Sequence, residues 1–347
     1  MKRLPSIYIM AFLLLASFVF NYYEADKSSY SLLLGNIRLN QVDKALRYLP
    51  GKQTVNILKM CIEMNKAKED FSLTSTETAY LVFKWISQNI DVDCSNYDGK
   101  YISANTAYNS GRAGFVGFSN LFLTLCLRLN IHTEFVNGHI KAMNNTDGKI
   151  SVIVEHAWNF IEIDNKYYLV DATLGTGTCD GKSSIRKYND FYFATKPEYF
   201  IRNHYPEFSE FQFLDKPISF DQFKSNAFLR HYFYYSGFKT IEPDKAEISL
   251  LDDSTITFTY DTSIPFLTVA VQYITFDGKD YHYNRYYDLT VSKGMVKVST
   301  DIRKYAKDIC GLIVFAGTEP GGSTYSIALF NVVYSSKKVS LNLRPNF

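Results

Sequence analysis

The chain has 347 residues, of which 37 are basic and 35 acidic, so its formal net charge is only +2. This balance excludes bulk electrostatic attraction to DNA or RNA, and no nucleic-acid partner is expected. With 46% hydrophobic and 21% charged residues, the chain can bury a core, which excludes a disordered tail. Five cysteines are too few for a disulfide-dense scaffold, and the length suits two or three domains.

The amino terminus has the pattern of a secretory signal peptide. Lys2 and Arg3 precede an apolar run over residues 7–20, which is shorter than the roughly 20 residues of a membrane-spanning helix. We expect residues 1–25 to be a signal peptide or, as the alternative, an uncleaved signal-anchor that holds the protein to the membrane through residues 4–23. Both interpretations predict a protein that is secreted, or anchored and facing the lumen or exterior.

Export has two chemical consequences. Cysteines that meet in the fold could pair in an oxidising compartment. Asn144 begins an Asn-Asn-Thr sequon, which makes it a glycosylation candidate in an exported protein.

Helical periodicity is expected from about residue 41 to residue 89. Thr74 and Glu77 have the spacing of a capping box, in which a hydroxyl and a carboxylate bond the first backbone amides of a helix. The apolar residues behind this box recur at helical spacing and predict one buried stripe: Ala79, Val82, Phe83, Ile86 and Ile90. A polar loop is expected over residues 91–103.

A second helix is predicted to begin near Phe115 and to form the buried centre of its domain. Its apolar positions share one face: Phe118, Leu121, Phe122, Leu125, Cys126 and Leu129. Three glycines crowd its start, at positions 111, 114 and 117, so the backbone there must turn tightly or approach another segment closely.

Strand patterns follow the helices. We expect a short strand over residues 131–136 that ends at Gly138, a long one over 151–163 and a third over 166–171. Asp164 and Asn165 have the composition of a two-residue hairpin turn between the last two. Helices followed by strands indicate the α+β class.

The last third changes character. Residues 190–235 are rich in aromatics and prolines and predict an irregular layer packed on the first domain. About seven short alternating runs then predict a β-sandwich; they cover residues 247–251, 255–260, 267–276, 286–291, 295–298, 311–316 and 326–334.

The predicted hairpin places a histidine beside a carboxylate. Because side chains alternate along a strand, His156 and Trp158 share a face, and the two-residue turn puts Asp171 diagonal to His156 on that face. A carboxylate that orients an imidazole is two-thirds of a nucleophilic triad. A purely structural hydrogen bond is the alternative interpretation of the same spacing.

Three ordered segments together resemble a known family. Residues 111–122 (GRAGFVGFSNLF), 155–159 (EHAWN) and 167–177 (YYLVDATLGTG) are similar to the motifs of transglutaminase-like domains, in particular the kyphoscoliosis-peptidase group. The resemblance covers about residues 75–235. It implies a papain/transglutaminase-like core with helices packed on an antiparallel sheet over residues 26–240, followed here by an immunoglobulin-like β-sandwich over 241–347.

The sequence departs from the family pattern at one position. The resemblance implies a nucleophilic cysteine directly before the x-Gly-aromatic step, and Phe115 stands there. His156 and Asp171 occupy the other two triad positions, so the triad is a remnant, since a phenyl ring cannot attack a carbonyl.

The same resemblance implies which residues line the cleft, namely Gly114, Gly117 and Trp158. Some relatives of the group also lack the nucleophile and act as scaffolds. We therefore expect a catalytically inactive protein-binding or scaffold module, with a protein or peptide partner, in the secretory pathway or at the cell surface.

Two alternatives remain open. One is an active cysteine-type peptidase or transamidase that uses a displaced thiol, Cys94 or Cys179, with His156 and Asp171. The other is a structural surface or matrix component without a specific cleft.

No cofactor and no metal is expected. The remaining histidines have no metal-ligand spacing, and no Cys-x-x-Cys occurs: His132, His139, His204, His231 and His282. Residues 175–177 (Gly-Thr-Gly) indicate a loop after the Asp171 strand and not a phosphate cradle, since no helical pattern follows them. Cys126 belongs to the apolar stripe of the second helix and predicts a core residue.

Overall fold

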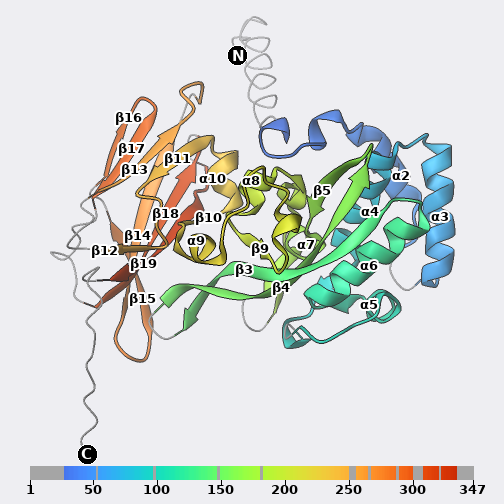
Figure 1. Cartoon of the computed structure of the whole chain (residues 1–347), viewed down its shortest axis with the longest axis horizontal. Coiled ribbons are helices and arrows are strands. Elements are labelled where there is room, and N and C mark those ends of the chain that lie inside the picture. Colours follow the sequence, from blue (N-terminus) through green and yellow to red (C-terminus); the bar gives the residue numbers. More distant parts are fainter. Residues whose placement is uncertain are drawn as a thin grey trace, which may run out of the picture.

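The computed structural model (Figure 1) describes residues 27–51, 54–96, 99–146, 149–179, 183–249, 255–264, 267–286, 289–299, 308–319 and 322–333. The expected signal peptide or anchor lies outside these residues, as does the side chain of Asn144. Within the described part of the chain, no helix combines the length and apolarity needed to cross a membrane.

The amino-terminal part is helical, as predicted. After two short 3-10 turns, η1 (Lys27–Ser29) and η2 (Leu34–Asn36), come the helices α2 (Leu39–Tyr48), α3 (Ile57–Asp70) and α4 (Ser75–Asn89). The capping box at the start of α4 is confirmed, because Thr74 and Glu77 bond each other's backbone amides. Glu77 also accepts hydrogen bonds from the Arg38 side chain at 2.7 and 2.6 Å. The predicted apolar stripe of α4 is buried.

The second predicted helix is α6 (Phe115–Arg128), and its apolar stripe is buried against the rest of the domain. The segment before it contains β1 (Asp91–Val92), η3 (Cys94–Asn96), α5 (Ala104–Ser110) and β2 (Arg112–Ala113). Gly111 ends α5 with a left-handed φ of 66°. A Cβ on Gly117 would lie 2.8 Å from that of Ala113, so close approach requires a glycine there.

The central sheet is antiparallel, with strand order β8-β5-β4-β3-β9. Its members are β3 (Thr133–Thr146), β4 (Lys149–Ile163), β5 (Lys166–Val170), β8 (Phe193–Thr195) and β9 (His204–Pro206). The predicted two-residue turn is confirmed, because Ile163 pairs with Lys166 and both turn residues have positive φ, 52° at Asp164 and 58° at Asn165.

The prediction that the first strand ends at Gly138 is wrong. Strand β3 continues to Thr146, and Gly138 pairs with His156 on one side and Pro206 on the other. A Cβ on Gly138 would lie 2.2 Å from the Tyr205 carbonyl oxygen. This glycine therefore admits the neighbouring strand β9 and does not stop β3.

The chain after β5 is more ordered than expected. The loop predicted over residues 175–177 is wrong for its first two residues, which end the one-turn helix α7 (Ala172–Thr176). This helix forms because the Asp171 side chain caps its first amides. Two strands of the aromatic-rich region, β8 and β9, join the edges of the central sheet. The other elements here are short: β6 (Gly177–Cys179), β7 (Ser184–Arg186), η4 (Asp190–Tyr192), α8 (Pro197–Phe200), η5 (Ser209–Gln212), α9 (Phe220–Ser225), β10 (Phe228–Leu229) and α10 (His231–Tyr235).

The predicted β-sandwich is present at the carboxyl-terminal end. One sheet has the order β10-β19-β18-β14-β15, with β12 on β19, and the other has the order β11-β13-β17-β16. The strands are β11 (Phe238–Glu242), β12 (Glu247–Ser249), β13 (Thr255–Tyr260), β14 (Thr268–Phe276), β15 (Tyr281–Tyr286), β16 (Leu289–Ser292), β17 (Met295–Ser299), β18 (Ile309–Gly317) and β19 (Tyr325–Val333). The single strand predicted over 286–291 is wrong, because β15 and β16 belong to different sheets.

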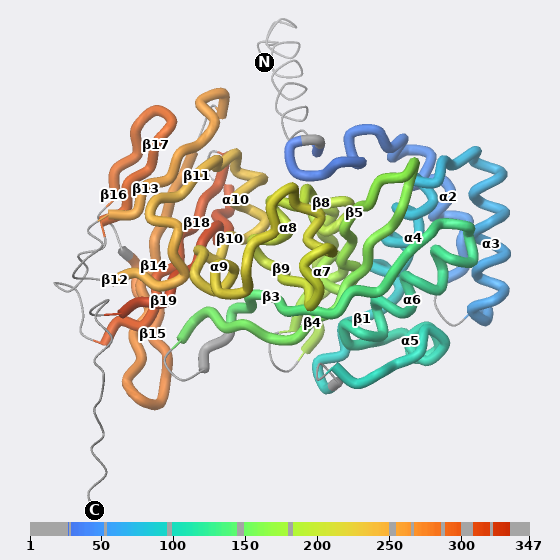
Figure 2. Tube along the Cα trace, viewed as in Figure 1, coloured from blue at the N-terminus to red at the C-terminus, as the bar shows by residue number. Residues whose placement is uncertain are grey.

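The expected domain boundary between residues 240 and 241 falls inside β11. Phe233 and Phe238 already belong to the sandwich core, and β10 pairs with β19. The far end of the β3–β4 hairpin reaches this second unit, as Figure 2 shows. Ile150 of β4 is buried there among Phe228, Ile274, Ile313 and Leu329.

A buried lysine lies at the junction of the two units. Lys141 of β3 is only 3% exposed, its Nζ donates to the Asn226 carbonyl and lies 4.9 Å from the centre of the Phe223 ring. Burial, followed by repulsion from Arg202, lowers the pKa of Lys141 to about 7, against an opposing attraction to Asp244.

We predict that Lys141→Met removes a pH-dependent component of stability. The folded-state pKa lies below the ordinary value of 10.5, so the native state binds fewer protons between about pH 7 and 10. Native stability should therefore rise with pH in this window, by at most about 1.4 kcal/mol per pH unit, and the methionine variant should lack that rise. Urea unfolding at several pH values measures the difference, with exposed Lys166→Met as the control. Parallel curves for wild type and Lys141→Met would contradict the prediction.

Candidate functional site

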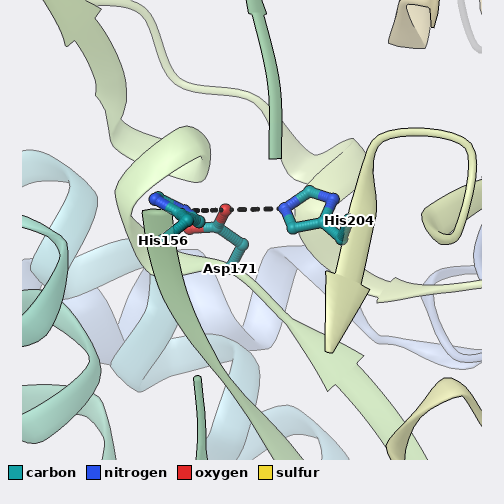
Figure 3. A group of neighbouring side chains, drawn as sticks. All are labelled: His156, Asp171 and His204. Carbon is teal, nitrogen blue, oxygen red and sulfur yellow. Dashed lines mark hydrogen bonds and ion pairs between the residues drawn. The ribbon is translucent and has the colours of Figure 1, made fainter. Parts of the chain in front are cut away.

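The predicted contact between His156 and Asp171 is present in the structure (Figure 3). His156 lies on β4 and Asp171 directly follows β5, and the distance from His156 Nε2 to Asp171 Oδ2 is 2.8 Å. Neither side chain is exposed to solvent. The two-residue turn between the strands fixes this register, which is why the spacing alone predicted the pair.

The Asp171 carboxylate is held by both of its oxygens. Oδ1 accepts hydrogen bonds from the backbone amides of Thr173 at 2.9 Å and Leu174 at 3.0 Å. Burial by itself would raise the pKa of Asp171, but attraction to His156 and hydrogen bonds from the two neighbouring imidazoles outweigh it and hold the pKa well below its ordinary value. An ionised carboxylate only accepts hydrogen bonds, so both imidazoles must donate to it through Nε2.

The second imidazole belongs to His204, which the sequence did not single out. Its Nε2 lies 3.0 Å from the same Oδ2 atom of Asp171, and its ring stacks on Phe200 at 3.7 Å between centroids. Burial lowers the pKa of His204, while the bond to Asp171 opposes this. Because β9 reaches the site by pairing with β3, no local spacing in the sequence could have identified this residue.

Phe115 occupies the place where the family resemblance puts the nucleophile. It is the first residue of α6, after the N-cap Gly114, and its ring centroid lies 5.2 Å from that of His156. The ring is 4% exposed. His156 Nδ1, the nitrogen not bound to Asp171, has no hydrogen-bond partner within the described part of the chain. The structure therefore brings Phe115 beside the hydrogen-bonded pair of His156 and Asp171.

The residues expected to line a cleft are buried instead. Trp158 is 1% exposed and contacts His204 and Phe200 edge to face. Gly114 is buried at the start of α6, and Gly117 packs against Ala113. With His156 and Asp171 fully covered, these residues form a closed packing environment.

The state of the cysteines contradicts the alternative in which a displaced thiol acts as the nucleophile. Cys94 and Cys179, the two proposed nucleophiles, are joined in a disulfide, so neither is a thiol in this structure. The other three, Cys61, Cys126 and Cys310, are free and buried. Cys126 lies in the core as predicted, and burial raises its pKa above the ordinary thiol value.

The same cluster contains the donor atoms of a metal site. Ligand atoms of His156, Asp171 and His204 lie within 4.8 Å of one another. Both Nε2 atoms, however, already donate to Oδ2 at 2.8 and 3.0 Å. A metal ion would have to displace both protons and separate packed side chains, so the described geometry fits a hydrogen-bonded network better than a metal centre.

Comparisons with known proteins find similarity in the segment of the chain that forms this site. The family model "Transglutaminase-like superfamily" matches residues 64–172, a span that includes Phe115, His156 and Asp171. Kyphoscoliosis peptidase of Homo sapiens is 27% identical over 215 residues, covering 60% of this chain and 32% of that protein. The Mus musculus protein of the same name is 26% identical over 267 residues, covering 75% and 39%.

A third relative, Hillarin of Drosophila melanogaster, is 26% identical over 196 residues, covering 52% of this chain and 24% of that protein. The chain thus spans between a quarter and two fifths of the length of these relatives. The resemblance to the superfamily and to the kyphoscoliosis-peptidase group is confirmed.

We predict that Asp171→Asn destabilises the fold by about 3–5 kcal/mol at pH 7, because the amide keeps one acceptor oxygen for the backbone amides and turns an NH2 donor toward the two buried imidazole N–H groups. The pKa of Asp171 is lowered in the folded state. Its contribution is therefore complete above the unfolded value near pH 4, and it is lost progressively as the pH falls from there through the lower folded-state pKa. The difference in the free energy of unfolding between wild type and variant should therefore become smaller at acidic pH.

Denaturant unfolding at pH 7 and at pH 3–4 measures both effects. Asp164→Asn is the matched control, because this turn residue is exposed and has φ of 52°, which asparagine adopts readily. Equal stability of Asp171→Asn and Asp164→Asn would refute a stabilising role for the network.

Proposed function

We propose that this chain, whose residues 64–172 match the family model of the transglutaminase-like superfamily, is a protein-binding or scaffold module that has lost the nucleophilic chemistry of such a domain. The observation that carries this proposal is Phe115 at the first position of α6, with its ring 5.2 Å from that of His156. The side chain has no lone pair to attack a carbonyl and no proton for His156 to accept.

Covalent acyl transfer in this arrangement needs a thiolate at the helix amino terminus. The helix dipole and an adjacent imidazole would lower the pKa of a thiol there. The Phe115 ring uses the same location for packing against His156, whose side chain is fully buried. The remaining polar groups hold strands β4 and β9 and helix α7 together, which is a structural role.

The enzymatic alternative draws on the names of two relatives, which are called peptidases. For this chain that reading requires an accessible thiol close to His156. Cys94 and Cys179 are bonded to each other, and the remaining cysteines are buried. The disulfide also supports export to the secretory pathway or cell surface as part of the proposal, since stable disulfides are rare in the cytosol.

A thiol-reactive probe tests the proposal. Native wild-type protein treated with iodoacetamide should show no labelling that depends on His156. The variant Phe115→Cys should be labelled rapidly, and its rate should fall at least about tenfold when His156→Ala is added, because the imidazole stabilises the thiolate.

Val116→Cys, one position further along α6, controls for the helix terminus alone. Thermal unfolding of each variant verifies that it is folded, since truncating a buried phenylalanine costs about 3–5 kcal/mol. Labelling of Cys94 or Cys179 in the wild type that is abolished by His156→Ala would overturn the proposal.

A further inference from the structure

Strand β4 has one edge that is only partly paired. Along its whole length it pairs with β3, but on its other side β5 covers only Asn159 to Ile163. At the opposite end the side chain of Asn331 from β19 bonds Ser151, accepting from its amide at 3.2 Å and donating to its carbonyl at 3.1 Å. The stretch between Ser151 and Asn159 lies between these two partners.

The direction of the backbone groups in this stretch follows from alternation. In a strand every second residue directs its N–H and C=O to the same edge. Ser151 directs both groups to Asn331, so Ile153, Glu155 and Ala157 direct theirs to the same edge. None of these three has a backbone hydrogen bond there within the described part of the chain. Ala157 is buried, so Ile153 and Glu155 present two donors and two acceptors to another extended backbone.

The side chains of this edge indicate which sequence would suit it. Val152, Ile153 and Val154 are half-buried, and Glu155 is exposed. A Cβ on Gly99 would lie 3.5 Å from Glu155 Oε2 and 3.4 Å from Phe115 Cζ, so the edge ends beside the closed site. An apolar side chain would match Ile153, and a cationic one would match the Glu155 carboxylate.

We propose that this edge of β4 binds an extended segment of a partner protein by strand addition, antiparallel to β4 and in line with β5. The segment would carry a basic residue opposite Glu155 and, two positions later, an apolar residue opposite Ile153. Main-chain hydrogen bonds would supply affinity and the two side chains selectivity. The inference rests on the proposed scaffold function and names the chemistry of its partner.

The test uses fluorescein-labelled, capped peptides of the sequence Thr-Lys-Thr-Val-Thr-Thr and of its version with glutamate in place of lysine. Fluorescence anisotropy with the full chain should show saturable binding, about tenfold tighter for the lysine peptide, since an ion pair and like charges across strands act in opposite directions. Glu155→Lys should invert this preference. Equal affinity of the two peptides for wild type would overturn the proposed basic partner.

The backbone contribution is tested separately. Ile153→Pro removes an amide that points away from β3, so it should leave the β3–β4 ladder intact and weaken peptide binding at least about tenfold. Should that variant fail to fold, a peptide methylated at the amides that face β4 tests the same bonds on wild-type protein. Undiminished binding in either experiment would overturn strand addition. Neither result depends on the labelling of thiols, so failure here is distinguishable from failure of the proposed function.

Discussion

The interaction on which this domain depends is the carboxylate of Asp171. It accepts four hydrogen bonds, from His156, His204 and the backbone amides of Thr173 and Leu174. These donors come from β4, β9 and the start of α7, so one ionised group ties three elements of the domain together. A buried charge is tolerated only when it is fully hydrogen-bonded. Removal of any one of the four donors would therefore destabilise the contacts of the carboxylate with the other three.

Under the proposed function, this network gives the residues of a triad a reason to persist without a nucleophile. In a triad the carboxylate orients the imidazole for a nucleophile, but the same contact also stabilises the sheet. With Phe115 packed against His156, the structural role of the contact does not depend on a nucleophile. Loss of Asp171 would leave two imidazoles without their shared acceptor in the core, which would lower the stability of the fold.

Much of this could be predicted from the sequence where local rules fix geometry. Asp164 and Asn165 set the hairpin register, and that register alone places His156 beside Asp171. The capping box of α4 is equally local. By contrast, His204 reaches the site through a three-residue strand whose pairing is non-local. Strand β3 continues beyond Gly138, where the glycine allows β9 to approach closely. The sequence alone does not distinguish a glycine that ends a strand from one that allows a neighbouring strand to approach. The pairing of Cys94 with Cys179 likewise depends on η3 and β6 meeting in space.

That disulfide closes a loop of 85 residues in sequence separation, which encloses α6, β3, β4, β5 and α7. Cross-linking a loop of this length removes chain entropy from the unfolded ensemble worth roughly 4–5 kcal/mol in the simple polymer treatment. A free-energy contribution of this size is a large part of the total stability of a typical domain. The same polypeptide folded in a reducing compartment would lack this contribution. The free energy of unfolding of the domain therefore depends on whether the chain has been oxidised.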